Sequence, residues 1–286
     1  MTRRQILYTV PVPCGVRAMI PADRIGVDVG VRLPLEGAVQ WAVDEGVTYV
    51  DVRPTDEILE SGGLDDETES KLVETIADDG ISLGLHTLSA INTAAYSPYV
   101  ADGVEQYLEA FVDLADRLNA DRIIVHAGYH FTSDEDARRR ASMDRLARLA
   151  EYAAARDVKL LLENMNPEPA DAEVHYLCSE LDDCKRYFET LLSETVAWAF
   201  NPPHANLHPT GVHGYLDELD LGVCGEVRLN DNRGIKEEHL PIGEGNIDFE
   251  RLFDTLERRQ YDGHYMLAFG TLEQMLAHRS ELATAH

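Results

Sequence analysis

Residues that can bind a metal ion or move a proton stand at the ends of several apolar segments of this sequence. His86 ends the segment GLH, His126 ends IIVH, and Glu163 ends LLLE. A carboxylate directly after three leucines is unusual, because it brings a charge next to a buried apolar region. Histidine and glutamate coordinate divalent metals and also act as general acids and bases. We expect these three residues to share one ligand or metal site.

A second group of polar residues lies further along the chain, in the segments NPPHAN, VRLNDNRG and EEHLPIGEG. Its members are Asn201, His204, Arg228, Asp231, Glu237, His239 and Glu244. A single histidine in such a place more often makes a structural hydrogen bond than binds a ligand. Several such residues at the ends of similar segments favour a ligand-binding cluster.

Short β-branched segments alternate with amphipathic stretches along the chain, and these elements must position the polar residues. Strands are predicted at residues 24–31, 48–53, 82–87, 122–127, 159–163, 196–200, 226–230 and 264–269. Helices are predicted at residues 35–45, 67–78, 104–118, 134–156, 180–193, 249–259 and 272–282, with a shorter helix or loop at 211–222. Repeated βα units are typical of parallel α/β folds, in which the strand ends carry the active site.

Eight strands in this order predict a closed (β/α)8 TIM barrel rather than an open doubly wound sheet. An open sheet would be expected to begin with a glycine-rich phosphate turn, and the pattern GxGxxG is absent from the sequence. The barrel is predicted to be a single domain at residues 24–286, after an N-terminal extension at residues 1–23. The chain of 286 residues is long enough for one such domain.

The acidic composition of the chain bears on its partners and its surroundings. The 52 acidic residues and 25 basic residues give a net charge of −27. Such a charge repels nucleic acids, because their binding depends on Lys and Arg displacing counterions from phosphates. Abundant acid with only four lysines is also typical of proteins from a high-salt cytoplasm, so we interpret the chain as halophilic.

Neither a membrane segment nor an export signal is expected from the sequence. No run of about 20 apolar residues is present, and the N-terminal stretch is interrupted by Pro11 and Pro13. The four cysteines have no CxxC spacing and are interpreted as reduced thiols. We therefore predict a cytoplasmic protein without a membrane partner.

The segments IIVHAGYH, LLLEN, NPPHAN and VRLNDNRG…EEHLPIGEGNIDF resemble, in this order, the xylose-isomerase-like barrel superfamily. This superfamily contains sugar and sugar-phosphate isomerases and epimerases and the type IV apurinic endonucleases. The resemblance covers residues 24–271, nearly the whole chain. It implies a carbohydrate-like ligand, and dimers or tetramers are common among related barrels, so a homo-oligomer is one expectation.

The resemblance also shows where this sequence departs from the isomerase pattern. A divalent metal is held there by a Glu, an Asp, a His and a second Glu, and the first ligand matches Glu163. The other three positions fall on Asn201, Arg228 and Gly270. Arg stays protonated and cannot bind a cation, and Gly has no side chain. The usual central metal is therefore predicted to be absent, with Glu163 paired to Arg228 and Gly270 leaving room for the longer side chain.

The three-metal endonucleases of the superfamily match at their outer positions instead. One outer site falls on His86, His126 and Glu163, and the other falls on His204, Glu237 and His239. If a metal remains, Zn²⁺ or Mn²⁺ is expected at one of these two sites, and the sequence does not choose between them.

Three functions follow from these observations. The first is proton transfer on a sugar, sugar phosphate or polyol, with Glu163 as the base and Arg228 stabilising an enolate. His86, His126, Asn201, His204, Asp231, His239 and Glu244 would contact the substrate. The second is a barrel that has lost catalysis and binds a metabolite or a partner subunit, as the loss of a carboxylate at Gly270 suggests. The third is metal-dependent hydrolysis at an outer site.

Overall fold

Eight parallel strands form a closed barrel in the computed structural model, which describes residues 20–60 and 63–283. They are β1 (Ile25–Gly30), β2 (Tyr49–Val52), β3 (Ser82–His86), β4 (Arg122–Val125), β6 (Lys159–Glu163), β8 (Val196–Phe200), β9 (Cys224–Leu229) and β10 (His264–Leu267). Strands β1 and β10 pair in parallel and close the barrel. The predicted fold and all eight predicted strands are confirmed, with differences of one or two residues at the ends.

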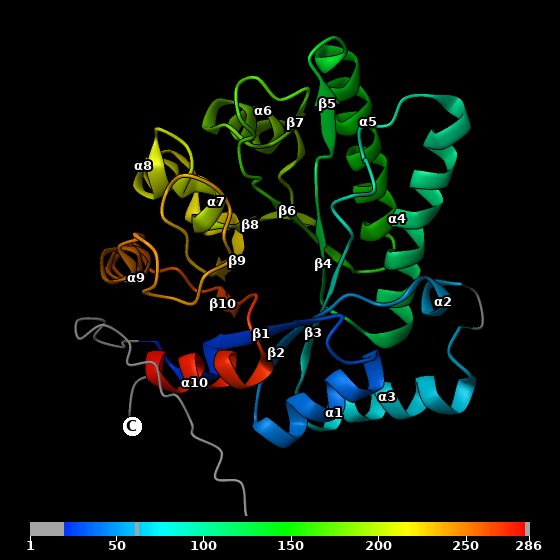
Figure 1. Ribbon diagram of the computed structural model, residues 1–286. Helices are drawn as coiled ribbons and strands as arrows, with labels where there is room; N and C mark the ends of the chain where they lie inside the picture. Colours follow the sequence, from blue (N-terminus) through cyan, green and yellow to red (C-terminus); the bar gives the residue numbers. More distant parts are fainter. Residues whose placement is uncertain (1–19, 61–62, 284–286) are drawn as a thin grey trace, which may run out of the picture.

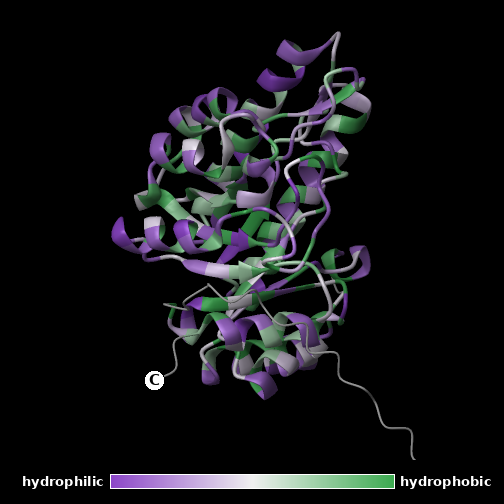
Figure 2. Ribbon diagram, turned by 60° about the vertical axis from the view of Figure 1, so that its left-hand side comes forward, coloured by the Kyte–Doolittle hydropathy of each residue, from purple (hydrophilic) through white to green (hydrophobic). Residues whose placement is uncertain are grey.

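Helices surround the barrel on the outside, and the first and last units lie side by side (Figure 1). The helices that follow or flank the barrel strands are α1 (Leu35–Glu45), α2 (Asp56–Leu59), α3 (Asp66–Asp78), α4 (Pro98–Leu118), α5 (Glu135–Ala154), α6 (Leu181–Leu191), α7 (Pro202–Asn206), α8 (Gly211–Glu218), α9 (Phe249–Arg258) and α10 (Leu272–Leu282). Hydrophilic and hydrophobic colours alternate along these helices, as expected where one face covers a barrel and the other meets solvent (Figure 2).

Some local elements were not expected from the sequence. An antiparallel pair of short strands, β5 (Tyr129–Phe131) and β7 (Val174–Tyr176), joins two loops that follow β4 and β6. Its pairing joins residues far apart in the chain, which periodicity within one segment does not reveal. The segment 211–222, predicted as a helix or loop, begins with α8.

Alternation along the strands separates the outer apolar core from the barrel interior. On β2, Val50 and Val52 belong to the core beneath the helices, whereas Asp51 points inward and contacts arginines of other strands. Successive side chains of a strand point to opposite faces, so every second residue faces the interior. Several of these interior residues on β1, β2, β4 and β9 are charged.

The predicted N-terminal extension lies outside the described residues except for residues 20–23. Ile20 is buried and forms an isolated parallel bridge with Ala283, which ties the start of the described chain to its end. Among the described helices, none has the length and apolar character needed to cross a bilayer.

Candidate active site

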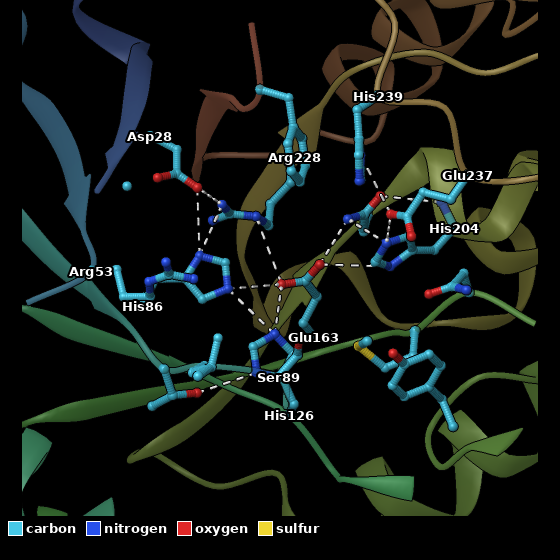
Figure 3. Close-up of a pocket in the computed structure, with 18 of the residues that line it drawn as sticks. Asp28, Arg53, His86, Ser89, His126, Glu163, His204, Arg228, Glu237 and His239 are labelled. Carbon is cyan, nitrogen blue, oxygen red and sulfur yellow. Dashed lines mark hydrogen bonds and ion pairs between the residues drawn. The ribbon is translucent and has the colours of Figure 1, made fainter. Parts of the chain in front are cut away.

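A pocket of about 540 Å³ opens at the C-terminal ends of the barrel strands, where active sites of such barrels lie. Nearly all of the predicted site residues meet there (Figure 3). Those that line it are His86, His126, Glu163, Asn201, His204, Arg228, Glu237 and His239. Asp231 and Glu244, which were predicted to bind substrate, do not line it.

Glu163 and two histidines form a compact group at the centre of the pocket. The Oε2 atom of Glu163 lies 3.6 Å from His86 Nε2 and 3.6 Å from His126 Nε2, and the two histidine nitrogens are 3.3 Å apart. Ligand atoms about 2.0–2.1 Å from a tetrahedral ion lie about 3.3 Å from one another. Oε2 is buried and has no hydrogen-bond partner among the described residues. These residues therefore fit one small divalent ion.

The surroundings of His126 favour the tautomer in which its Nε2 atom can coordinate a metal ion. The hydroxyl of Thr87 donates to the backbone oxygen of Ile124 at 2.9 Å, so its oxygen accepts from His126 Nδ1 at 3.2 Å. Burial lowers the pKa of His126 and favours the neutral ring. With the proton on Nδ1, the lone pair of Nε2 faces Glu163. Support of a ligating histidine through its second nitrogen is the usual arrangement in metal sites.

Asn201 holds the other oxygen of Glu163. Its side-chain amide donates to Glu163 Oε1 at 2.7 Å, and its side-chain oxygen accepts from the backbone N–H of His204 at 3.2 Å. Asn201 is the N-cap of α7, and Pro202 follows at the first helical position, which is a favourable sequence for a helix start. The segment NPPHAN thus fixes Asn201 and His204 beside Glu163.

His204 and Glu237 form a charged pair on the wall of the pocket. Both ring nitrogens of His204 face acceptors, Asn164 O at 2.7 Å and Glu237 Oε1 at 2.7 Å. Burial disfavours the imidazolium, but the hydrogen bond and charge of Glu237 outweigh it and raise the pKa of His204. Burial likewise favours neutral Glu237, and the bond from His204 outweighs it and lowers the pKa of Glu237.

The second predicted metal set, His204, Glu237 and His239, does not converge in the same way. His204 and Glu237 bond directly to each other, and His239 Nδ1 is 3.5 Å from Glu237 Oε1. Among the described residues, the group whose ligand atoms all lie within 4.8 Å of one another is His86, His126 and Glu163. His239 instead stacks on Phe269 with ring centroids 3.5 Å apart. The geometry favours the first outer set.

Arg228 is fully buried and its guanidinium is occupied by other groups. Nη1 contacts Glu226 and bonds to Asp51 at 2.8 Å, and Nη2 contacts Asp28 and lies 3.2 Å from His86 Nδ1. Its Nε lies 3.7 Å from Glu163, an ion pair without a hydrogen bond. The predicted pairing with Glu163 is therefore a minor contact. Its Nη groups are engaged by Glu226, Asp51 and Asp28, which leaves Nε–H as the group that faces Glu163, so the expected role in stabilising an enolate would rest on Nε–H alone.

Carboxylates outnumber cations in the interior below the pocket. Asp28, Asp51, Glu163 and Glu226 are buried together with Arg122 and Arg228. Four carboxylates against two guanidinium groups leave two negative charges when the histidines are neutral. Burial and the charge of Glu226 raise the pKa of Asp51 to about 6 despite both arginines. A cation bound near Glu163 would offset part of this excess.

Asp231 has a structural role in place of the predicted contact with substrate. It is fully buried, and its carboxylate accepts backbone N–H bonds from Asn232, Gly243, Gly245 and Ile247. A Cβ at Gly245 would overlap with Asp231, so the IGEG turn closes around this carboxylate. The turn holds the loop that carries Glu237 over the pocket. Glu244 points to solvent from the same turn.

Gly270 also departs from expectation. It has φ +87°, and a Cβ built on it would have Gln274 as its neighbour within 4 Å, not Arg228. Its backbone oxygen accepts from Arg32 Nε at 2.8 Å. The residue serves a left-handed turn after β10, and the contacts of a Cβ there give no support to the prediction that Gly270 makes room for Arg228.

Several pocket residues were missed by sequence reasoning. They are Asp28, Arg32, Arg53, Asn166, Tyr176 and Phe269. Asp28 and Asp51 interrupt the apolar segments IGVDVG and YVDV, and a charge inside a strand pattern is a signal of an inward position. Arg53 directly follows such a segment, as His86 does.

Known proteins were compared with the sequence and with the fold. A family model described as xylose isomerase-like TIM barrel matches residues 39–282. An uncharacterized protein of Methanocaldococcus jannaschii, MJ1311, is 26% identical over 183 residues, which is 61% of this chain and 59% of that protein, less than two thirds of its length. The putative L-ribulose-5-phosphate 3-epimerase SgbU of Escherichia coli is 25% identical over 246 residues, covering 82% of this chain and 79% of SgbU.

Solved structures with the same fold include sugar epimerases and an endonuclease. A D-tagatose 3-epimerase-like protein superposes with a TM-score of 0.76 at 20% identity, covering 91% of this chain and 95% of that one. Endonuclease IV from Thermus thermophilus gives 0.71 at 16% identity, with 91% and 97% covered. The structures show the shared fold, and the family model covers most of the sequence. The chain therefore belongs to the xylose isomerase-like TIM barrel family.

Proposed function

We propose that this protein isomerises or epimerises a small sugar or sugar phosphate by moving a proton on a carbon beside a carbonyl group. The polar pocket at the strand ends has a volume suited to a monosaccharide. The proposal is also supported by the likeness to a putative sugar-phosphate epimerase and to structures of sugar epimerases.

One observation carries the proposal: two carboxylates, Glu163 and Glu237, line the same pocket with His204 close to both. Proton removal from one face of a carbon and return on the other requires a group on each side. Glu237 supplies the second carboxylate that Gly270 cannot provide.

In this scheme Glu163 accepts the proton from the carbon, and the electron pair of the C–H bond moves into the carbonyl to form an enolate. Glu237 and His204 share a proton across a 2.7 Å bond and deliver it from their side of the pocket. Release and uptake balance, so no further reactant is needed. The same pair can take up the proton when the reaction runs in the opposite direction.

We propose further that Arg228 fills the family's central metal position and that a single Zn²⁺ or Mn²⁺ binds to His86, His126 and Glu163. The Oε2 atom of Glu163, which has no hydrogen bond to a described residue, and the excess of buried carboxylates support this choice. Such an ion would polarise the carbonyl oxygen of the substrate. The chain's own contribution is the fixed triangle of ligand atoms and the acid–base pair beside it.

The test combines metal analysis with isotope exchange. Purified protein is expected to hold about one Zn²⁺ or Mn²⁺ per chain and to exchange solvent deuterium into at least one sugar or sugar phosphate of a panel. Glu163→Gln should lower exchange by about 10²–10⁴-fold and lose the metal, whereas Glu237→Gln should lower exchange and keep it. Glu244→Gln, on the exposed turn, is the matched control and should change neither.

Two other functions give different results in this experiment. A barrel that only binds its ligand would show binding without exchange for the whole panel. A metal-dependent hydrolase, which the same His–His–Glu group could support through a metal-bound water, would lose activity in His86→Gln but tolerate Glu237→Gln. Either result would replace proton transfer as the function.

A further inference from the structure

Two guanidinium groups line the part of the pocket formed by the ends of β1 and β2. Arg53 follows β2, and its backbone N–H bonds to Gly30 O at 3.0 Å. Arg32 is held by the backbone, with Nε 2.8 Å from Gly270 O and Nη1 3.1 Å from Val29 O. Among the residues that the structure describes, no carboxylate lies within 4.0 Å of either guanidinium group.

Arg53 is half-buried but has no acidic partner among the described residues. The chain has 52 acidic residues for 25 basic ones, and many of its arginines pair with a carboxylate. The two arginines inside the same barrel, Arg122 and Arg228, each contact at least two carboxylates. For the side chain of Arg53, half-buried in the pocket wall, the structure records no hydrogen bond or ion pair to a described residue.

Arg53 lies away from the proposed acid–base pair. In Figure 3, Arg53 lies beside His86 on one side of the pocket, and His204 and Glu237 lie on the other, with Glu163 between them. Alternation along β2 turns Arg53 to the interior, as it does Asp51 two residues earlier. A ligand whose reacting carbon is near Glu163 would therefore have its other end near Arg53.

We propose that Arg53 and Arg32 bind the phosphate group of a phosphorylated substrate. This inference rests on the proposed function and specifies its substrate as a sugar phosphate rather than a neutral sugar. The guanidinium fork matches phosphate oxygens and gives strong charge-assisted hydrogen bonds. Ser89 lines the same pocket and offers a hydroxyl donor. The cationic wall is compatible with a dianion, whereas Glu163 and Glu237 would repel it elsewhere in the pocket.

The test measures the binding of inorganic phosphate by calorimetry at constant ionic strength, with and without a chelator. Arg53→Gln is expected to weaken binding about ten- to hundredfold in both conditions. Arg53→Lys, which keeps the charge, should recover part of the affinity. Arg140→Gln makes the same charge change on the exposed face of α5 and should have no effect.

The outcomes separate this inference from the proposed function. Phosphate affinity that is unchanged in Arg53→Gln, or that disappears with the chelator, would overturn the phosphate site, even if deuterium exchange into neutral sugars is found. Binding of gluconate but not phosphate at Arg53 would overturn it as well. Arg53-dependent phosphate binding without exchange into any sugar phosphate would support the site and contradict the proposed reaction.

Discussion

At the scale of single residues, the site differs from the family pattern through a few exchanges whose effects are local. Asn201, which the resemblance to the isomerases aligns with a carboxylate, donates to Glu163, and Arg228, which it aligns with a histidine, takes part in a buried ion cluster. Each exchange removes a negative or neutral ligand from the central position. Glu163 keeps one oxygen without a hydrogen-bond partner among the described residues, and it faces the two histidines.

Restoring the family aspartate at Asn201 should destabilise the protein. In Asn201→Asp an acceptor replaces the amide that donates to Glu163 Oε1 at 2.7 Å, so two carboxylates meet in a buried site. We expect the free energy of unfolding at pH 8 to fall by about 2–4 kcal/mol. The loss should be smaller at pH 5, where the pair can share a proton, and smaller when Mn²⁺ is added. Gln106→Glu, the same change from amide to acid at an exposed position of α4, should cost about 0.5 kcal/mol or less.

Protonation of Asp51 should give stability a distinct dependence on pH. Burial and Glu226 raise its pKa from 3.8 to about 6, so the folded protein binds a proton more tightly than the unfolded chain. The stability that this proton provides is present below about pH 4 and is lost as pH rises through 6. The stability of the wild type minus that of Asp51→Asn should fall by about 3 kcal/mol between these limits. Chemical denaturation at several pH values measures it, and a constant difference would contradict the assignment.

At the scale of elements, the barrel strands carry a polar interior that depends on one small residue. Gly84 on β3 lies opposite Asp51 in the register of β2 and β3. A Cβ at Gly84 would overlap with Asp51 Oδ1 and come within 2.9 Å of Arg122 Nε. The absence of a side chain on β3 therefore makes space for the pair of Asp51 and Arg122, whose atoms bond at 2.7 Å.

Gly84→Ala should therefore disrupt this ion pair and lower the free energy of unfolding by about 2–4 kcal/mol. Gly103→Ala on α4 is a matched control, because no atom lies within 4 Å of a Cβ there. Alanine in an exposed helix position should stabilise the protein by about 0.5–1 kcal/mol. Urea unfolding of both variants gives the comparison, and a neutral Gly84→Ala would show that the interior can adjust.

At the scale of the whole molecule, the net charge of −27 acts on stability through the solvent. Ion pairs such as Arg24–Glu257 and Arg148–Glu105 neutralise some of the acidic side chains, but the acidic residues outnumber the basic ones by 27. The remaining carboxylates repel one another, and this repulsion is weakest in the unfolded chain, where they are far apart.

Salt should accordingly raise the melting temperature. Ions shorten the Debye length from about 10 Å at 0.1 M to about 3 Å at 1 M and screen the repulsion. We expect Tm to rise by about 5 °C or more between 0.1 and 1 M KCl at pH 7.5. Near pH 5, close to the isoelectric point of about 4.6, the rise should be much smaller. Equal effects at both pH values would contradict screening as the cause.

The sequence by itself determined the barrel and the position of the main site residues. Apolar segments ending in His86, His126 and Glu163 predicted strands, and the closed barrel brings their ends together because parallel strands share one C-terminal face. Segment patterns also located His204 and Glu237, since both follow strands that end at the same mouth.

Only the tertiary structure decided what these residues contact. Whether Asp231 faces a ligand or four backbone N–H groups, and whether Arg228 faces Glu163 or Asp28, Asp51 and Glu226, depends on elements up to 200 residues apart. Local periodicity predicts which face a side chain occupies but not which distant charge it meets there. The sequence therefore did not choose between the two outer metal sets, because that choice depends on interatomic distances that arise only when the barrel closes.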